Sequence, residues 1–304
     1  MKTGISRALA IAAICAILLS SCGGQGSTKS DDKKHAGLNI VTSFYPVYIA
    51  TINITNNIQG VSVTILTGGA TGCLHDYNLR TGDMKRLEEA DILVINGAGM
   101  EGFMDKILQQ QPGLQIANAS RGINLLKDES TGKENAHVWV SISGAIGQVR
   151  NIAEQLSAFD PVNAQAYGRN AEAYIKKLED LEKHMHKELD SLKDRNIITF
   201  HEAFAYFAQE FGLNVRAVME LDPGSEPGAG ELASLIDTVR KDKVKALFTE
   251  PQYPSDTADI IAGETGAGVY VLDPVVTGSA NGDTDAYIIK MEQNMKTLKE
   301  ALNR

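Results

Sequence analysis

Apolar and polar residues alternate along the first half of the chain in short blocks that predict strands followed by helices. Strands are expected over residues 38–44, 61–66 and 91–97, because each is a short run rich in β-branched and aliphatic residues. Helices are expected over residues 47–58 and 81–90. Alternation of this kind predicts a parallel α/β sheet.

A different pattern interrupts this alternation over residues 164–192. Apolar residues recur there at spacings of three and four, which predicts one apolar stripe on a helix of about eight turns. The stripe consists of Tyr167, Ala171, Tyr174, Leu178, Leu181, Met185, Leu189 and Leu192. A helix of this length is unlike a strand–strand crossover, so we expect a spine that joins two lobes.

Strand and helix patterns alternate again after the long helix. The predicted fold is therefore α/β, with two parallel-sheet lobes bridged by one long rigid helix. The expected divisions are an N-terminal lobe over 38–145, a connecting segment with the long helix over 146–194, and a C-terminal lobe over 195–304. In the second lobe, strands are predicted at 196–200, 244–250 and 268–274, and helices at 201–213, ending at Gly212, 231–243 and 285–302.

The N-terminus has the pattern of an export signal. Lys2 and Arg7 precede an apolar run over residues 8–20, which is shorter than the roughly 20 residues of a membrane span. The run ends in "LSSC", which resembles the bacterial lipoprotein cleavage box. We therefore expect a signal peptide over 1–21 and lipid on Cys22, with an ordinary secretory signal and an incidental cysteine as the alternative. Residues 22–37, rich in glycine, serine and charge, predict a flexible tether.

Charge and cysteine content restrict the function further. The formal charge of −9 argues against nucleic-acid binding, because an acidic surface repels phosphate. The chain has three cysteines. With Cys15 in the signal and Cys22 acylated, Cys73 is left as the only free thiol, so no internal disulfide is expected.

Three of the six histidines are expected to be solvated. His35 lies in the tether. His184 and His186 lie among charged residues on the long helix, and because they are two residues apart their side chains point in different directions. The other three occupy loops or strand ends. They are His75, His137 and His201.

These three histidines and Asp273 are candidate metal ligands. His75 and His137 fall in the first lobe, whereas His201 and Asp273 follow predicted strands of the second lobe. Ligands gather at the carboxyl ends of strands in α/β sheets, so the four suggest one site between the lobes. For any one residue alone, a hydrogen-bonded structural role is the alternative.

Several segments, in order, resemble the solute-binding lipoproteins of ABC importers for zinc and manganese. They cover nearly all of the chain after the signal. They are "VTSFYPVY", "LHDYNLRTGDMKRLEEADILVINGAGME", "HVWVS", "FHEAFAYFAQEFGL", "GVYVLDP" and "DAYIIKMEQNMKTLKEAL".

The resemblance implies a metal-binding protein rather than an enzyme. By position, the ligands would be His75, His137, His201 and Asp273, holding Zn²⁺ or, as the alternative, Mn²⁺ in the cleft between the lobes. The protein would be a monomer outside the cytoplasm, attached to a bacterial membrane by its lipid. It would deliver its ion to the ABC permease of the same importer.

The choice of metal depends on residues at and near the site. His201 favours zinc, because imidazole suits zinc and the family's manganese binders have a carboxylate at this position. The loop over residues 125–135 has no histidine, whereas zinc-binding relatives often carry a His-rich loop there. Glu202 has three alternative roles, which are to cap the following helix, to orient a ligand or to act as an extra oxygen ligand.

Two other functions compete with metal import. An exported zinc hydrolase would need an open coordination position and a general base. The sequence has no HExxH pair, because Ala205 stands where the motif begun by His201 and Glu202 needs its second histidine. A surface adhesin is compatible with the lipid anchor, but no sequence feature identifies a host partner.

The loop "GCLHDYNLR" leaves one question open. Relatives have proline before the first histidine, whereas Leu74 stands here. A Cys73 thiolate would tighten zinc binding and disfavour manganese, but it would slow release and be open to oxidation. With His75 and its three predicted partners the site is complete without sulfur.

Overall fold

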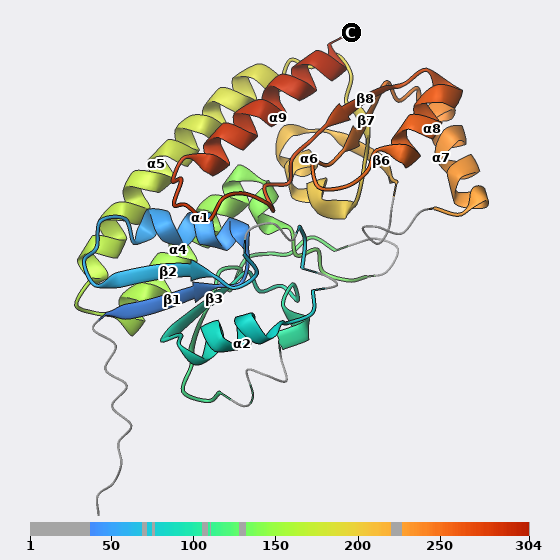
Figure 1. Cartoon of the computed structure of the whole chain (residues 1–304). Helices are drawn as coiled ribbons and strands as arrows, with labels where there is room; N and C mark the ends of the chain where they lie inside the picture. Colours follow the sequence, from blue (N-terminus) through green and yellow to red (C-terminus); the bar gives the residue numbers. More distant parts are fainter. Residues whose placement is uncertain are drawn as a thin grey trace, which may run out of the picture. The chain divides into compact units, whose positions relative to one another are not determined.

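Two parallel sheets, one in each half of the chain, form the framework of the protein (Figure 1). The structure is a computed structural model that describes residues 37–68, 72–74, 77–104, 109, 111–127, 132–219 and 227–303. The predicted signal, Cys22 and the tether up to residue 36 lie outside these residues, as does His75. Among the helices that the structure describes, none is both long enough and apolar enough to cross a membrane.

The first sheet has the strand order β2-β1-β3-β4, and all neighbours are parallel. Side chains alternate between its faces. Ile40 packs into the large core shared with α1 and α4, and Val41 packs on the opposite face beside α2. The elements are β1 (Leu38–Thr42), α1 (Tyr45–Ile54), β2 (Val61–Ile65), α2 (Thr81–Glu88), β3 (Ile92–Ile95), η1 (Gly102–Met104), β4 (Gln115–Asn118), η2 (Val138–Val140) and α4 (Ile142–Phe159).

The second sheet repeats this plan with the order β6-β5-β7-β8, again all parallel. Ile197 faces the large core, and Ile198 faces a separate cluster under α7 and α8. The elements are β5 (Asn196–Thr199), η3 (Glu202–Phe204), α6 (Ala205–Phe211), β6 (Asn214–Val218), α7 (Ala229–Asp242), β7 (Ala246–Thr249), α8 (Asp256–Thr265), β8 (Gly268–Val271) and α9 (Ala286–Leu302). The predicted α/β architecture with two parallel-sheet lobes is confirmed.

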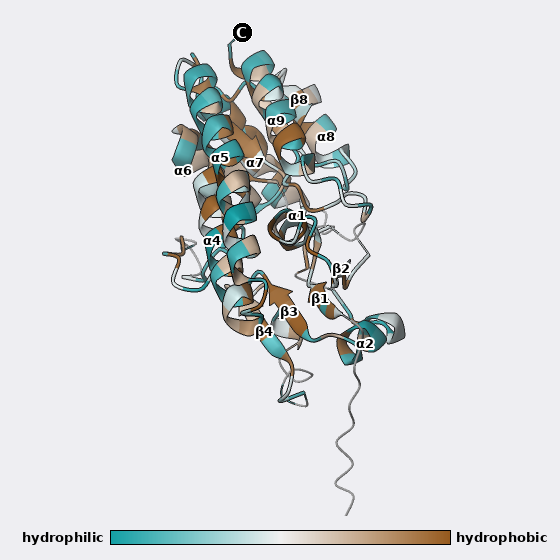
Figure 2. Ribbon diagram, turned by 90° about the vertical axis from the view of Figure 1, so that its left-hand side faces the viewer, coloured by the Kyte–Doolittle hydropathy of each residue, from teal (hydrophilic) through white to brown (hydrophobic). Residues whose placement is uncertain are grey.

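The predicted long helix is α5 (Ala164–Leu189), and its apolar stripe is buried as expected. It contacts α1 and α4, which pack on strands of the first sheet, and α9, which packs on β8 of the second lobe. Its outward side is mainly polar in Figure 2, where the strands β1 and β3 are apolar. The largest core cluster contains residues of both lobes and of α5, so the apolar side of the helix packs against both lobes.

The helices and strands that were not predicted from the sequence are β4, α4, β6 and α8, and the short 3₁₀ turns η1 and η2 were not predicted either. β6 lies at a sheet edge and is half or fully exposed, so its residues lack the apolar pattern of a buried strand. The predicted helix over 201–213 begins with the 3₁₀ turn η3 and ends at Gly212, whose φ of 64° is the left-handed conformation of a C-cap.

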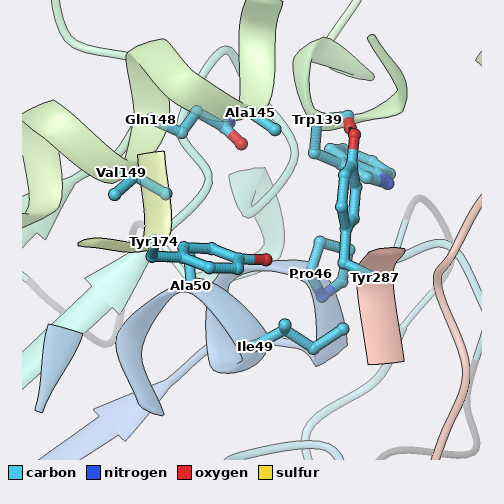
Figure 3. A pocket seen from close by; sticks show the side chains of 9 residues that line it. All are labelled: Pro46, Ile49, Ala50, Trp139, Ala145, Gln148, Val149, Tyr174 and Tyr287. Atoms are coloured by element: carbon cyan, nitrogen blue, oxygen red, sulfur yellow. Dashed lines mark hydrogen bonds between the residues drawn. The ribbon is translucent and has the colours of Figure 1, made fainter. Parts of the chain in front are cut away.

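Buried hydrogen bonds tie the two lobes together beside the large core. Trp139 donates from Nε1 to the carbonyl oxygen of Pro274 at 2.8 Å, and the Tyr287 hydroxyl donates to the carbonyl oxygen of Trp139 at 2.8 Å. Figure 3 shows both rings at the edge of a pocket between α1 and α4, with Tyr174 across from them. Segments of both lobes are therefore fixed to one another close to His137.

Candidate metal site

His137 and His201 come from different lobes and meet at their ring nitrogens. His137 immediately precedes η2, and His201 stands between β5 and η3. Both side chains are buried, with exposures of 0% and 1%. Their Nε2 atoms lie 3.3 Å apart, so two of the predicted ligands converge as expected.

The ring of His137 is oriented by Asn135. The Asn135 amide nitrogen donates to the carbonyl oxygen of Glu202 at 2.9 Å, which identifies Oδ1 as the acceptor. That oxygen accepts from the backbone N–H of His137 and faces its Nδ1, each at 2.9 Å. Nδ1 therefore carries the proton, and in the neutral ring the lone pair is on Nε2.

The ring of His201 is oriented by Glu250, which sequence reasoning missed. Nδ1 of His201 donates to Oε1 of Glu250, and Gln252 donates to Oε2 at 2.7 Å. Burial alone would lower the pKa of His201, but the Glu250 carboxylate and Cys73 outweigh it and raise the pKa to about 10. Glu250 directly follows β7, and the strand-end rule that selected His201 could have found it.

The position of this pair follows from the strand order. β5 and β7 are neighbours in the sheet although they are not consecutive in the chain. β6 is added on one side of β5 and β7 on the other, so a topological switch point lies between β5 and β7. Ligand sites in open α/β sheets lie at such a point. His201 and Glu250 follow these two strands, which brings them to the same edge.

Two neutral imidazoles in this arrangement direct their Nε2 lone pairs at one another. That contact is unfavourable unless a positive charge lies between them, which either a proton on His201 or a metal ion supplies. Zn–N bonds of about 2.0–2.1 Å at tetrahedral angles place two nitrogens about 3.3–3.4 Å apart. The observed 3.3 Å matches that spacing. A histidine held by a carboxylate through its other nitrogen is a common metal-binding arrangement.

Cys73 lies at the same point. Its Sγ is 3.6 Å from Nε2 of His137 and 3.4 Å from Nε2 of His201. These three residues form a group whose ligand atoms all lie within 4.8 Å of one another. The side chain is half-buried, and burial raises the pKa of the Cys73 thiol.

The structure does not bring Asp273 into this group. One carboxylate oxygen pairs with Lys290 of α9, and the other accepts from the backbone N–H of Val275 at 2.8 Å. The backbone of Asp273 is also held by Asn294. Glu202 is the first residue of η3, and its carbonyl oxygen accepts from the Asn135 amide.

The remaining described histidines lie on α5, where His184 is exposed and His186 is half-buried. His186 is bonded to Asp190 and lies near Glu182 and Glu210. Glu210 accepts from the first two N–H groups of α4, and burial, followed by the neighbouring Glu182, raises the pKa of Glu210 to about 7. This group therefore has a structural role at the start of α4.

The sequence matches the model of the family described as the periplasmic component A of a zinc-uptake complex, ZnuA, over residues 40–301. The chain belongs to the ZnuA family. It is 32% identical over 313 residues to the high-affinity zinc uptake system protein ZnuA of Bacillus subtilis (strain 168), and the match covers 97% of each chain.

Solved structures of similar proteins contain either manganese or zinc. The solute-binding protein FpvC of Pseudomonas aeruginosa, in complex with Mn²⁺, has 32% identity and a TM-score of 0.78, with 88% of this chain and 98% of that one covered. The Zn(II)-bound ZnuA-like domain of AdcA from Streptococcus pneumoniae has 33% identity and a TM-score of 0.75, with 88% and 100% covered.

Family membership confirms that the chain is a metal-binding component of metal uptake and not an enzyme. The alternative of an exported hydrolase is thereby set aside. The two solved relatives carry different ions, so the family alone leaves zinc and manganese open.

Proposed function

We propose that the protein captures a divalent transition-metal ion, zinc before manganese, and delivers it to an ABC permease. The observation that carries this proposal is the approach of the His137 and His201 Nε2 atoms to 3.3 Å across the two lobes. The spacing suits tetrahedral zinc, and imidazole is a better ligand for zinc than for manganese. The zinc-uptake relatives support the same choice.

The full ligand set rests on the sequence. His75 would join His137 and His201, since it stands two residues after Cys73. Asp273 is the fourth residue of the set, but its carboxylate would have to leave Lys290 before it could bind an ion. Glu202 would act through Asn135, whose amide holds the Glu202 carbonyl and whose oxygen holds His137.

The cellular setting is part of the proposal. The protein would act as a monomer outside the cytoplasm, anchored by a lipid on Cys22 after removal of residues 1–21. The tether over residues 22–37 would let the binding unit reach the permease in the same membrane. Incorporation of a radiolabelled fatty acid into the protein, and its loss in Cys22→Ala, tests the anchor.

The site is tested by metal titration of His137→Ala and His201→Ala, with His184→Ala as the control on the exposed face of α5. One ion per chain is expected for the unmodified protein and the control. Each site variant should bind zinc more weakly by orders of magnitude, because it loses a direct ligand. Unchanged stoichiometry and affinity in the His137 variant would refute the site.

Delivery is tested separately by growth under zinc limitation of cells that lack their own zinc-binding importer subunit. The unmodified protein, expressed with its cognate permease, should restore growth, and the His201→Ala variant should not. Rescue by both proteins would argue against capture at this site as the step that feeds the permease.

A further inference from the structure

The geometry points to Cys73 as a direct metal ligand that takes the place expected for Asp273. This inference rests on the proposed capture function and concerns which ion the same site selects. Under it, the ion is held by the Cys73 thiolate and by the imidazoles of His137 and His201. As the metal–sulfur and metal–nitrogen bonds form, the Cys73 thiol and Nε2 of His201 each release one proton to solvent, so the two positive charges of the ion replace those of two protons.

The first argument is metric. Zn–S at about 2.3 Å and Zn–N at about 2.0–2.1 Å, at tetrahedral angles, put sulfur about 3.5–3.6 Å from each nitrogen. The observed separations are 3.4 Å and 3.6 Å. All three spacings among the sulfur and the two nitrogens therefore fit a tetrahedral zinc ion.

The second argument concerns how the cysteine is held. Gly72 has a φ of 71°, and a Cβ there would lie 3.3 Å from the Tyr253 hydroxyl, so a glycine lets the loop approach the second lobe closely. On the other side, Leu74 is fully buried in the large core. Farther along, the Tyr77 hydroxyl donates to Asp83 in the first turn of α2 at 2.8 Å. The described residues on both sides of Cys73 are therefore held by packing, and its Sγ lies 3.4 Å from Nε2 of His201.

The third argument is charge. A buried zinc site with neutral imidazoles gains from one anionic ligand, and the resemblance assigns that part to Asp273. Here Lys290 already neutralises the Asp273 carboxylate, and the Val275 N–H holds its other oxygen. The Cys73 thiolate supplies the missing negative charge without breaking that ion pair.

The consequence is selectivity. Thiolate sulfur is a soft ligand that binds zinc well, whereas manganese prefers carboxylate, carbonyl and water oxygens. A site with sulfur therefore discriminates against Mn²⁺ more strongly than one with three imidazoles and a carboxylate. Cys73 is thus the residue of this chain that decides between the two ions.

Cobalt is the probe that tests sulfur ligation directly, because a thiolate bound to Co²⁺ produces an intense near-ultraviolet charge-transfer band. The purified protein loaded with one equivalent of Co²⁺ should show this band. Cys73→Ser should lose it while still binding an ion, and Cys22→Ala should keep it. Zinc should also protect Cys73 from alkylation in the unmodified protein, a measurement that does not depend on the folding of any variant.

Affinities complete the test. Cys73→Ser should lower zinc affinity by roughly tenfold or more and change manganese affinity by less than about threefold. Asp273→Asn, which keeps an acceptor for Val275, should change zinc affinity by less than about threefold. A protein that binds one ion without the band, with Cys73 alkylated equally fast with and without zinc, overturns the inference and leaves the proposed function intact. Failure of the unmodified protein to bind any ion would instead overturn the proposed function.

Discussion

Asn135 offers the sharpest test of how this site is prepared, because its amide makes three contacts at once. Its oxygen accepts from the backbone N–H and from Nδ1 of His137, and its nitrogen donates to the Glu202 carbonyl. Asn135→Ala removes all three without touching a proposed ligand. The ring of His137 then loses the acceptor that fixes its proton on Nδ1 and directs Nε2 at the ion.

The magnitude has two parts. Loss of a partner that orients a metal-binding histidine weakens metal binding about 10–100-fold, which corresponds to about 1.4–2.7 kcal/mol. Asn135 is buried, so the His137 N–H and the Glu202 carbonyl also lose a buried partner. Each unsatisfied group costs about 1–3 kcal/mol, and we expect the metal-free protein to lose about 2–4 kcal/mol of unfolding free energy.

The assay is a competition titration in which a chromophoric chelator sets the free zinc concentration. Asn151→Ala is the matched control, because the Asn151 amide also holds two backbone carbonyls, at 2.8 and 2.9 Å, but none at the site. It should lose stability and keep its zinc affinity. Asn135→Asp retains an acceptor for His137 and should recover most of the affinity lost in Asn135→Ala. Zinc affinity within about twofold of the unmodified protein in Asn135→Ala would refute the reasoning.

Two further predictions concern stability. Burial, followed by the neighbouring Glu182, raises the pKa of Glu210 to about 7. Between about pH 4.5 and 7, Glu210 therefore keeps a proton in the native protein that it has released in the unfolded chain. The unfolding free energy should fall as pH rises through that window. Glu182→Gln should therefore raise unfolding free energy at pH 8 by about 0.5–1 kcal/mol and change it little at pH 4, as measured by denaturant unfolding; an equal gain at both pH values would contradict this. Trp139→Phe leaves the Pro274 carbonyl without its donor and opens space in the core, and it should cost about 2–4 kcal/mol. Tyr287→Phe, which loses only a hydroxyl, should cost about 1–2 kcal/mol in the same experiment, and unchanged stability in either variant would argue against the tie between the lobes.

Local patterns in the sequence were sufficient for much of the fold. The apolar stripe of α5 and the aliphatic runs of β1, β3, β5 and β7 are properties of neighbouring residues, so they could be recognised without knowing the tertiary structure. His137 and His201 could be selected because a strand end or loop is itself a local feature. Edge strand β6 was missed, because its half or fully exposed residues form no continuous aliphatic run.

The partners of the site depend on packing between distant segments. Asn135 and Glu250 look like ordinary polar residues in the sequence, and only the folded chain brings them to the two histidine rings. Lys290 meets Asp273 because α9 folds back against β8. Cys73 reaches His201 across 128 residues of chain, a distance over which spacing carries no information.

The unequal burial of the three clustered side chains sets an order of events for an ion in this site. His137 and His201 are enclosed, whereas Cys73 is half-buried and lies on a short loop. Under the proposed function, an incoming ligand would reach the ion most readily from the Cys73 side, because Cys73 is the least buried of the three. A permease that displaced the Cys73 thiolate would then open a first coordination position without separating the lobes.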